Sequence, residues 1–416
     1  MKSPSERRLF ASRHIAIMIP LGYASGLPLA LSKGTLQAWL ADTGVDIETI
    51  GLFSLVGLPY SLKFLWAPLM DRYLPPGLAR LGRRRGWMLL TQLLLIVAIG
   101  LMAFGSPAKA PWILAAMAVS IAFLSASQDI AFDAYRTDVL APKERGLGAA
   151  VSVQSYRLAM LDTGGFLLVI AERMGWMFAY LTAAARMLVG LFGTLLAPEP
   201  EHPAPAPPTL AVAVINPLRE FLSRKSSWAL LALVVLYKAS DSLAGSLTMA
   251  FLIEGMEFSK ESIFAVSKTM GLVASIGGGL LGGALMIKLG LVRSLLAFGV
   301  LQALSNFGFM ALALVGKDTG MLALAVFIEQ LSGGMGTTAF VALIMALCHH
   351  SYTASQFALL TALASVGGNL SGPIAGKLVA WLDWTLFFGI SAAAALPGLA
   401  LVWWLRYDLQ ARDRID

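Results

Sequence analysis

The sequence has little charge and almost no cysteine for its length. Only 13% of its 416 residues are charged, whereas a soluble domain of this size carries roughly 25%. The apolar fraction is 57%, and so much apolar surface has no place in one water-soluble core, which indicates that lipid is the solvent. The single cysteine, Cys348, excludes a disulfide framework and any cysteine-based metal site. We expect it to be a small buried apolar residue.

The sequence also lacks the signatures of an enzyme. Its four histidines fall at predicted helix ends or in loops, without metal-ligand spacing. The glycine run at 277–279 is not followed by the Lys-Ser/Thr pair of a phosphate-binding loop, and no nucleophile elbow appears. We therefore predict a protein that is not an enzyme, with no catalytic or metal-ligating residues and no cofactor.

Long apolar segments run through the whole chain. A helix needs about 20 mostly apolar residues to cross a bilayer. The first segment follows several basic residues, but it extends from 14 to 41 without a cleavage site, so we interpret it as an uncleaved span. Breaks at charges and at Pro/Gly clusters predict about 12 transmembrane helices, near 14–41, 49–71, 86–106, 110–134, 146–170, 174–197, 227–254, 261–288, 291–315, 319–347, 352–380 and 382–405.

Basic residues are distributed unevenly between the predicted loops. One side of the membrane holds most of them, whereas the other side holds only Lys109, Arg173, Lys260 and Lys317. Because loops rich in Lys and Arg stay in the cytoplasm, both termini are predicted there. The net charge of +7 therefore reflects topology, and no nucleic-acid partner is expected.

The segment 198–226 differs from the rest of the chain. Residues 197–208 (APEPEHPAPAPP) are too rich in proline for a regular helix. Residues 209–225 form a short amphipathic stretch, which we expect to lie on the inner membrane surface. The predicted organisation is an N-terminal six-helix half (1–197), a cytoplasmic linker (198–226) and a C-terminal six-helix half (227–416).

Two loops at equivalent places in the halves are similar to each other. The first has PLMDR at 68–72 and GRRR at 82–85, and the second has GGAL at 282–285 and KLG at 288–290, followed by Arg293. Both resemble the Gly-x-Leu-x-Asp-Arg-x-Gly-Arg-Arg loop of the major facilitator superfamily, although the first contains an insertion and the second lacks the Asp. The resemblance implies an all-α membrane protein with two pseudo-symmetric six-helix halves. Candidate residues for conformational change are Asp71 and Arg72, in the first of these loops, and Arg145, in the predicted inner loop between the fourth and fifth spans.

A second resemblance covers nearly the whole chain. The segments that carry it are 26–29 (GLPL), 35–39 (TLQAW), 63–72 (KFLWAPLMDR), 125–130 (SASQDI), 144–146 (ERG), 236–238 (LYK), 333–340 (GGMGTTAF) and 356–360 (QFALL). In this order they resemble the AmpG-type muropeptide permeases. The resemblance implies proton-driven import of N-acetylglucosaminyl-1,6-anhydro-N-acetylmuramyl peptides from periplasm to cytoplasm, by alternating access across the bacterial inner membrane. The expected partners are this solute and the lipid bilayer, and we expect a monomer.

Two alternatives remain open at this point. The first is a related permease for another bulky anion, such as acetyl-coenzyme A or a siderophore-related compound. The second is a membrane sensor that binds cell-wall fragments without transporting them. A sensor is expected to carry a soluble signalling domain, and only about a dozen residues follow Trp404.

Charged residues inside the spans are the strongest functional signal, because such residues are costly in lipid and mark pathways by default. The family resemblance implies that the first, fourth, seventh and tenth spans line the cavity, and each carries a charge. Lys238 and Asp241 are three residues apart on one helical face, so they can neutralise each other until an anionic solute arrives, or they form a permanent structural pair. The candidate solute-binding residues are Lys33, Gln37, Gln128, Arg157, Lys238 and Asp241. The candidate proton carriers are Asp129 and Glu329, because a carboxyl removed from water favours its protonated form.

Other polar groups in the spans lead to structural predictions. Lys63 lies towards a span end, and we expect its amine to extend to the lipid headgroups. Asp162 and Arg186 are unexpected in this family, and at 1.5 Å rise per residue their depths differ by roughly 8 Å, so we predict an ion pair. The alternative places Asp162 near Arg157.

Small residues line the fifth and eighth predicted spans. In the eighth span they follow every fourth position, at Gly271, Ser275, Gly279 and Gly283. Because small residues let helix backbones approach closely, we expect the fifth and eighth spans to cross.

Overall fold

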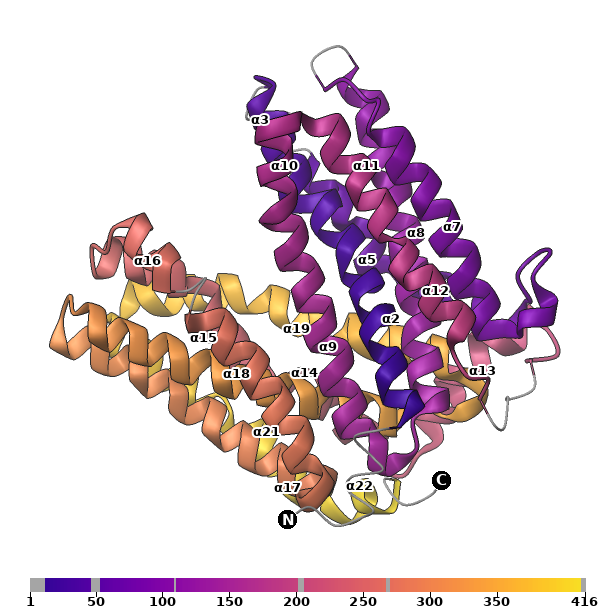
Figure 1. Ribbon diagram of the computed structural model, residues 1–416. Coiled ribbons are helices and arrows are strands. Elements are labelled where there is room, and N and C mark those ends of the chain that lie inside the picture. The colour runs from indigo at the N-terminus through magenta and orange to yellow at the C-terminus, as the bar shows by residue number, and fades with distance from the viewer. Residues whose placement is uncertain (1–11, 46–52, 108–109, 201–205, 267–269, 413–416) are drawn as a thin grey trace. The chain divides into compact units, whose positions relative to one another are not determined.

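The computed structural model describes residues 12–45, 53–107, 110–200, 206–266 and 270–412, and every regular element within these ranges is a helix (Figure 1). The helices pack as two compact units. Unit 1 comprises Met1–Leu140, Val151–Leu218 and Cys348–Leu359, and unit 2 comprises Ala141–Ala150, Arg219–Leu347 and Leu360–Asp416. The division into halves at 198–226 stays a prediction.

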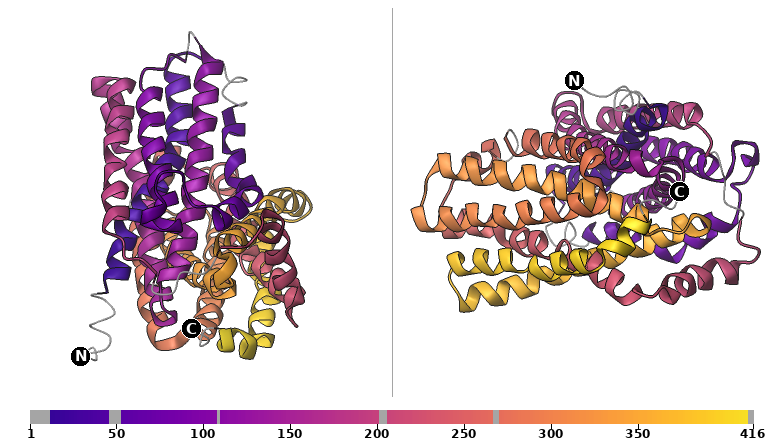
Figure 2. Two further views of the ribbon diagram at one scale, coloured as in Figure 1. Left: turned by 90° about the vertical axis from the view of Figure 1, so that its right-hand side faces the viewer. Right: turned by 90° about the horizontal axis from the view of Figure 1, so that it is seen from below.

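Unit 1 contains a group of long helices that lie side by side and roughly parallel (Figure 2). The helical elements from its N-terminus to the linker are α2 (Arg13–Ala30), η1 (Leu31–Thr35), α3 (Leu36–Asp42), η2 (Phe53–Gly57), α5 (Leu58–Leu62), η3 (Lys63–Leu65), α6 (Ala67–Arg72), η4 (Ala79–Leu81), α7 (Arg83–Met102), α8 (Pro111–Val139), α9 (Pro142–Gly164), α10 (Phe166–Met174), α11 (Trp176–Arg186), α12 (Leu188–Leu196) and α13 (Leu210–Ser223). The first turns of α9 belong to unit 2.

The first two predicted spans are interrupted helices. Pro28 lies inside α2, and the π-helical turn η1 follows directly before α3 resumes. The second span consists of α5 and α6, flanked and separated by the 3-10 turns η2 and η3. Proline removes a backbone donor and crowds the preceding turn, so these proline-containing segments depart from α-helical geometry.

Unit 2 continues with α14 (Ser227–Leu236), α15 (Ala239–Ala250), η5 (Phe251–Gly255), α16 (Lys260–Val266), α17 (Leu272–Val315), α18 (Thr319–Leu347), η7 (His350–Tyr352), α19 (Thr353–Trp381), α20 (Trp384–Ala393), α21 (Leu396–Trp404) and α22 (Arg406–Arg412). Of these, η7 and the start of α19 belong to unit 1. Within α17, Gly290 has φ 72° and ψ 173°, so α17 is two helical arms joined at one residue. Only glycine adopts this backbone conformation readily. The two separate spans predicted at 261–288 and 291–315 meet here.

Aromatic clusters form the core of each unit. In unit 1, Trp39 of α3 packs on Trp176 and Tyr180 of α11, with ring centroids 5.9 Å and 4.9 Å apart. In unit 2, Phe388 of α20 packs on Phe251 and Phe309, with centroids 4.8 Å and 5.3 Å away. Burial of such large rings supplies much of the packing in a helical bundle.

The outer faces of the helices are apolar, as a bilayer requires. Val97 and Leu101 of α7 are more than half exposed, and Trp381 and Trp404 are exposed at helix ends, where tryptophan is enriched at membrane interfaces. Among the described residues, eight helices are long and apolar enough to cross a membrane, with the two arms of α17 counted as one. The total of twelve spans and the cytoplasmic termini stay predictions.

The amphipathic segment of the linker forms a helix. Residues 210–223 form α13, which contains Pro217. The carbonyl of Pro217 accepts a hydrogen bond from Gln356 at 3.1 Å, so this helix is fixed to other residues of unit 1.

Candidate functional site

Four charged side chains form a buried cluster in unit 1. Asp129, Asp133 and Arg136 lie on one face of α8, because they are spaced by four and three residues. Arg136 Nη2 donates to Asp133 Oδ1 at 2.7 Å, and Lys63 Nζ lies 3.3 Å from Asp133 Oδ2. We refer to Lys63, Asp129, Asp133 and Arg136 as the charge cluster.

Asp129 is held within this cluster by α2. The Ser25 hydroxyl donates a hydrogen bond to Asp129 Oδ1. The charges of Lys63, Asp133 and Arg136 all act on the Asp129 carboxyl. The predicted proton carrier of the fourth span is therefore surrounded by fixed charges in a site with little solvent access.

The prediction for Lys63 was wrong. Lys63 is only 9% exposed, and its amine pairs with Asp133 instead of extending to the lipid headgroups. The reason is local: Lys63 starts the 3-10 turn η3, which redirects its side chain towards α8. A buried ammonium group needs a nearby opposite charge to remain charged, and Asp133 provides it.

The predicted solute-binding residues of unit 1 have different environments. Gln128 is 1% exposed, and within the described residues neither of its amide atoms has a hydrogen-bond partner. Gln37 is exposed and Arg157 is half-buried. The side chain of Lys33 lies outside the described part of the chain.

In unit 2, Lys238 and Asp241 form the predicted ion pair. Lys238 Nζ lies 2.6 Å from Asp241 Oδ2 and 3.5 Å from the Thr337 hydroxyl of α18. The pair lies where α14 ends and α15 begins. Its side chains are 19% and 29% exposed, so a solute can approach them. Glu329, also on α18, is half-buried.

Tyr237, next to Lys238, is occupied by protein contacts. Its hydroxyl donates to the Leu295 carbonyl at 3.1 Å, and its ring stacks on Phe340 with centroids 5.9 Å apart. Tyr23 is also engaged, because its hydroxyl donates to Asp162 at 2.6 Å.

The predicted pairing of Asp162 with Arg186 is confirmed. Arg186 Nη1 contacts Asp162 Oδ2, and the guanidinium lies over the Phe166 ring, 4.6 Å from its centroid. With Tyr23, these residues connect α2, α9 and α11. We refer to Tyr23, Asp162 and Arg186 as the Tyr23 triad.

The loop residue Asp71 is completely buried, beside an arginine that the sequence did not single out. Arg84 lies 2.9 Å from both Asp71 and Asp138. Asp71 also accepts hydrogen bonds from the Ser355 backbone amide at 2.8 Å and from the Ser355 hydroxyl at 2.5 Å. It thereby binds the free amide groups at the start of α19, where carboxylates are favoured. We refer to Asp71, Arg84 and Asp138 as the Arg84 cluster.

The other two loop candidates have environments of their own. Arg72 is half-buried, with its guanidinium 5.5 Å from the centre of the Tyr73 ring. Arg145, in unit 2, is 4% exposed and lines a cavity of about 200 Å³ together with Met286 and Gly290.

The fifth and eighth predicted spans are neighbours, as expected. A Cβ added at Gly283 of α17 would lie 2.5 Å from the Ala150 Cβ and 2.9 Å from the Gly146 carbonyl, both on α9. These contacts lie within unit 2. Glycine at 283 is therefore what permits this approach.

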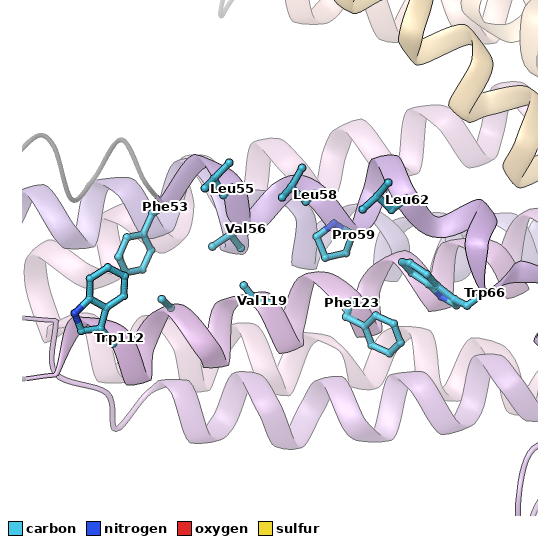
Figure 3. Close-up of a pocket in the computed structure, with 11 residues that line it drawn as sticks. Phe53, Leu55, Val56, Leu58, Pro59, Leu62, Trp66, Trp112, Val119 and Phe123 are labelled. Atoms are coloured by element: carbon cyan, nitrogen blue, oxygen red, sulfur yellow. The ribbon is translucent and has the colours of Figure 1, made fainter.

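An apolar groove runs between α8 and the segment from η2 to α6 (Figure 3). It measures about 400 Å³, and its walls include Leu58, Leu62, Trp66, Val119 and Phe123. Its described walls are apolar, whereas a peptide or a sugar needs polar partners, so we do not include this groove in the candidate solute site.

Comparison with known proteins agrees with this helical architecture. The family model of the Major Facilitator Superfamily matches residues 18–368. This chain is a member of the major facilitator superfamily. The superfamily consists of membrane transporters, and the many apolar helices make this chain a multi-pass membrane protein.

Curated relatives show which transporters of the superfamily this chain resembles. The Escherichia coli K12 anhydromuropeptide permease is 52% identical over 404 residues, which cover 97% of this chain and 82% of that protein. A Rickettsia felis protein that carries the transporter name AmpG 4 is 32% identical over 96% of this chain and 98% of its own length.

Solved structures share the fold of this superfamily member. The human organic anion transporter MFSD10 superposes with a TM-score of 0.64 at 19% identity, covering 96% of this chain and all of that one. A bacterial homologue of the iron transporter ferroportin gives a TM-score of 0.61 at 16% identity, covering 98% and 99%. At these identities the likeness concerns the fold alone.

Proposed function

We propose that this chain imports anhydromuropeptides across the bacterial inner membrane, with the proton gradient as its energy source and alternating access as its mechanism. The observation that carries the proposal is the 52% identity to the E. coli anhydromuropeptide permease across 97% of the chain. Because the match covers nearly the whole chain, both predicted halves have a counterpart in that permease.

The polar groups of the spans suit such a solute. Muropeptides combine peptide carboxylates with sugar hydroxyls and amides, so a complementary site needs cations and amide side chains. Lys238, paired with Asp241 and partly exposed, can exchange its carboxylate partner for one on the solute. The half-buried Arg157 is a second candidate cation, with Lys33, Gln37 and Gln128 as further candidates.

Uptake into proteoliposomes tests the proposal directly. We expect radiolabelled anhydromuropeptide tripeptide to accumulate when the lumen is alkaline, and acetyl-coenzyme A not to compete. Inhibition by acetyl-coenzyme A with no muropeptide uptake would favour a permease for another bulky anion. Binding without uptake would favour a sensor.

Proton coupling is tested separately, with Asp129→Asn and Glu329→Gln. We expect at least one of these variants to lose gradient-driven accumulation by about tenfold or more while still exchanging solute across the membrane at equal pH. Wild-type accumulation in both variants would remove these acids as proton carriers.

A further inference from the structure

Lys63 has no place in the solute site described above, although it is the most deeply buried lysine whose contacts the structure describes. Its amine contacts Asp133, which Arg136 also binds. Arg136 is further fixed by the Ser152 hydroxyl at 2.8 Å and lies over the Phe132 ring at 5.4 Å. The position of Lys63 relative to α8 is therefore defined by a rigid set of contacts.

The charges of this cluster balance in only one protonation state. When Asp129 is ionised, the two carboxylates Asp129 and Asp133 cancel the two cations Lys63 and Arg136. When Asp129 binds a proton, one positive charge is left over in a site with little access to water, where the side chains of Lys63 and Asp133 are 11% and 14% exposed. An uncompensated buried charge is unfavourable, and a nearby anion relieves it.

The other described groups around Asp129 do not alter this balance. Tyr60 and Tyr156 are close enough to act on the Asp129 carboxyl, and both are neutral phenols at ordinary pH. Ser25 is a neutral donor from α2. Among the described residues, the charged groups that act on Asp129 are Lys63, Asp133 and Arg136.

We propose that Lys63 is a fixed counter-ion that gives the proton-loaded charge cluster its net positive charge, and so links proton uptake at Asp129 to the binding of an anionic solute. The inference rests on the proposed function, which makes Asp129 a proton carrier and the solute an anion. Because linkage is reciprocal, the proton favours the anion as much as the anion favours the proton. Lys63 acts through Asp129, so it is a positioning residue.

The electrostatic step can be tested without any solute. In infrared pH titrations of the full chain in nanodiscs, the carboxylic C=O band that disappears in Asp129→Asn reports protonation of Asp129. We expect Lys63→Met to move the midpoint of this band to higher pH by about one unit or more, and Asp133→Asn to move it to lower pH. Lys63→Arg and the exposed-lysine control Lys377→Met should keep the wild-type midpoint. Unchanged midpoints in Lys63→Met and Asp133→Asn, or no band that depends on Asp129, would overturn the proposal.

The link to the solute is tested by calorimetric titration with anhydromuropeptide tripeptide at several pH values. We expect wild-type affinity to rise on acidification, and Asp129→Asn to bind independently of pH with the affinity that wild type shows in acid. Lys63→Met should bind about tenfold more weakly in acid, because its proton-loaded cluster is neutral. If wild type binds no muropeptide at any pH, the proposed function fails, whereas the infrared shift in Lys63→Met still decides the role of Lys63. If muropeptide binds and Lys63→Met matches wild type at every pH, only the inference about Lys63 fails.

Discussion

The Arg84 cluster of unit 1 is a buried network of charges, whereas the Lys238–Asp241 ion pair of unit 2 is local and partly exposed. In the Arg84 cluster the side chains of Arg84 and Asp71 are 5% and 0% exposed, and the partners come from segments far apart in the chain. Lys238 and Asp241 are neighbours on one stretch of helix, with side chains 19% and 29% exposed. Removing one partner of a buried pair leaves an uncompensated charge, which costs far more than the loss of an exposed pair. We therefore expect substitutions in the Arg84 cluster to act mainly on stability, and those at Lys238 and Asp241 to act mainly on solute binding.

The strongest test of this difference is Arg84→Met. It removes the cation that contacts both Asp71 and Asp138, and we expect the free energy of unfolding to fall by about 3–5 kcal/mol. Thermal unfolding in detergent measures the loss. The matched control is Arg80→Met in the same loop, where Arg80 is exposed. If the two variants were equally stable, the buried Arg84 would contribute no more to stability than an exposed arginine, which would contradict this prediction.

The Tyr23 triad provides an intermediate case, because its charged side chains are about a quarter exposed. Arg186→Met and Asp162→Asn should each destabilise the protein by about 1–3 kcal/mol, since each leaves one charge unpaired in a span. The double variant should be more stable than Arg186→Met alone. Strictly additive losses in this double-mutant cycle would mean that the two residues do not act as a pair.

The substitution Gly283→Ala tests how much close backbone packing in unit 2 contributes to stability, for comparison with the charge networks. The added Cβ would overlap Ala150 and the Gly146 carbonyl, and we expect a loss of about 1–3 kcal/mol from overpacking. Gly277→Ala is the control, because a Cβ there meets nothing within 4 Å. That control should be neutral or slightly stabilising, since alanine favours helix.

The smallest effect on stability is expected for Asp241→Asn. A partly exposed pair contributes about 1 kcal/mol or less, so the melting temperature should change little. Solute affinity should change about tenfold, because Lys238 loses the partner that the solute displaces. A large loss of stability with unchanged affinity would place this pair among the structural networks.

Much of the helical layout could be predicted from the sequence, because long apolar runs end at charges and at Pro/Gly clusters. The predicted span 319–347 coincides with α18, and the span 352–380 differs from α19 by one residue at each end. The Lys238–Asp241 pair was predictable because helical spacing alone brings the two side chains together.

The parts that escaped prediction depend on contacts between distant segments. Nothing near Lys63 in the sequence indicates the turn η3 or the approach of Asp133, 70 residues away. In the run Arg83–Arg85, all three residues are consistent with a positive inner loop, and only the fold shows that Arg84 is the buried one. The available signal was Asp138, an acid at the end of a span otherwise followed by basic residues.

The pairing of Asp162 with Arg186 has an evolutionary consequence. Each residue makes the other tolerable, so neither position can lose its charge alone without a penalty, and lineages should carry both residues or neither. The easiest route from both residues to neither passes through a neutral polar residue such as asparagine at 162. Asparagine retains an oxygen for the Tyr23 hydroxyl, and Arg186 can then be replaced in a second step. Across relatives, positions 162 and 186 should therefore covary.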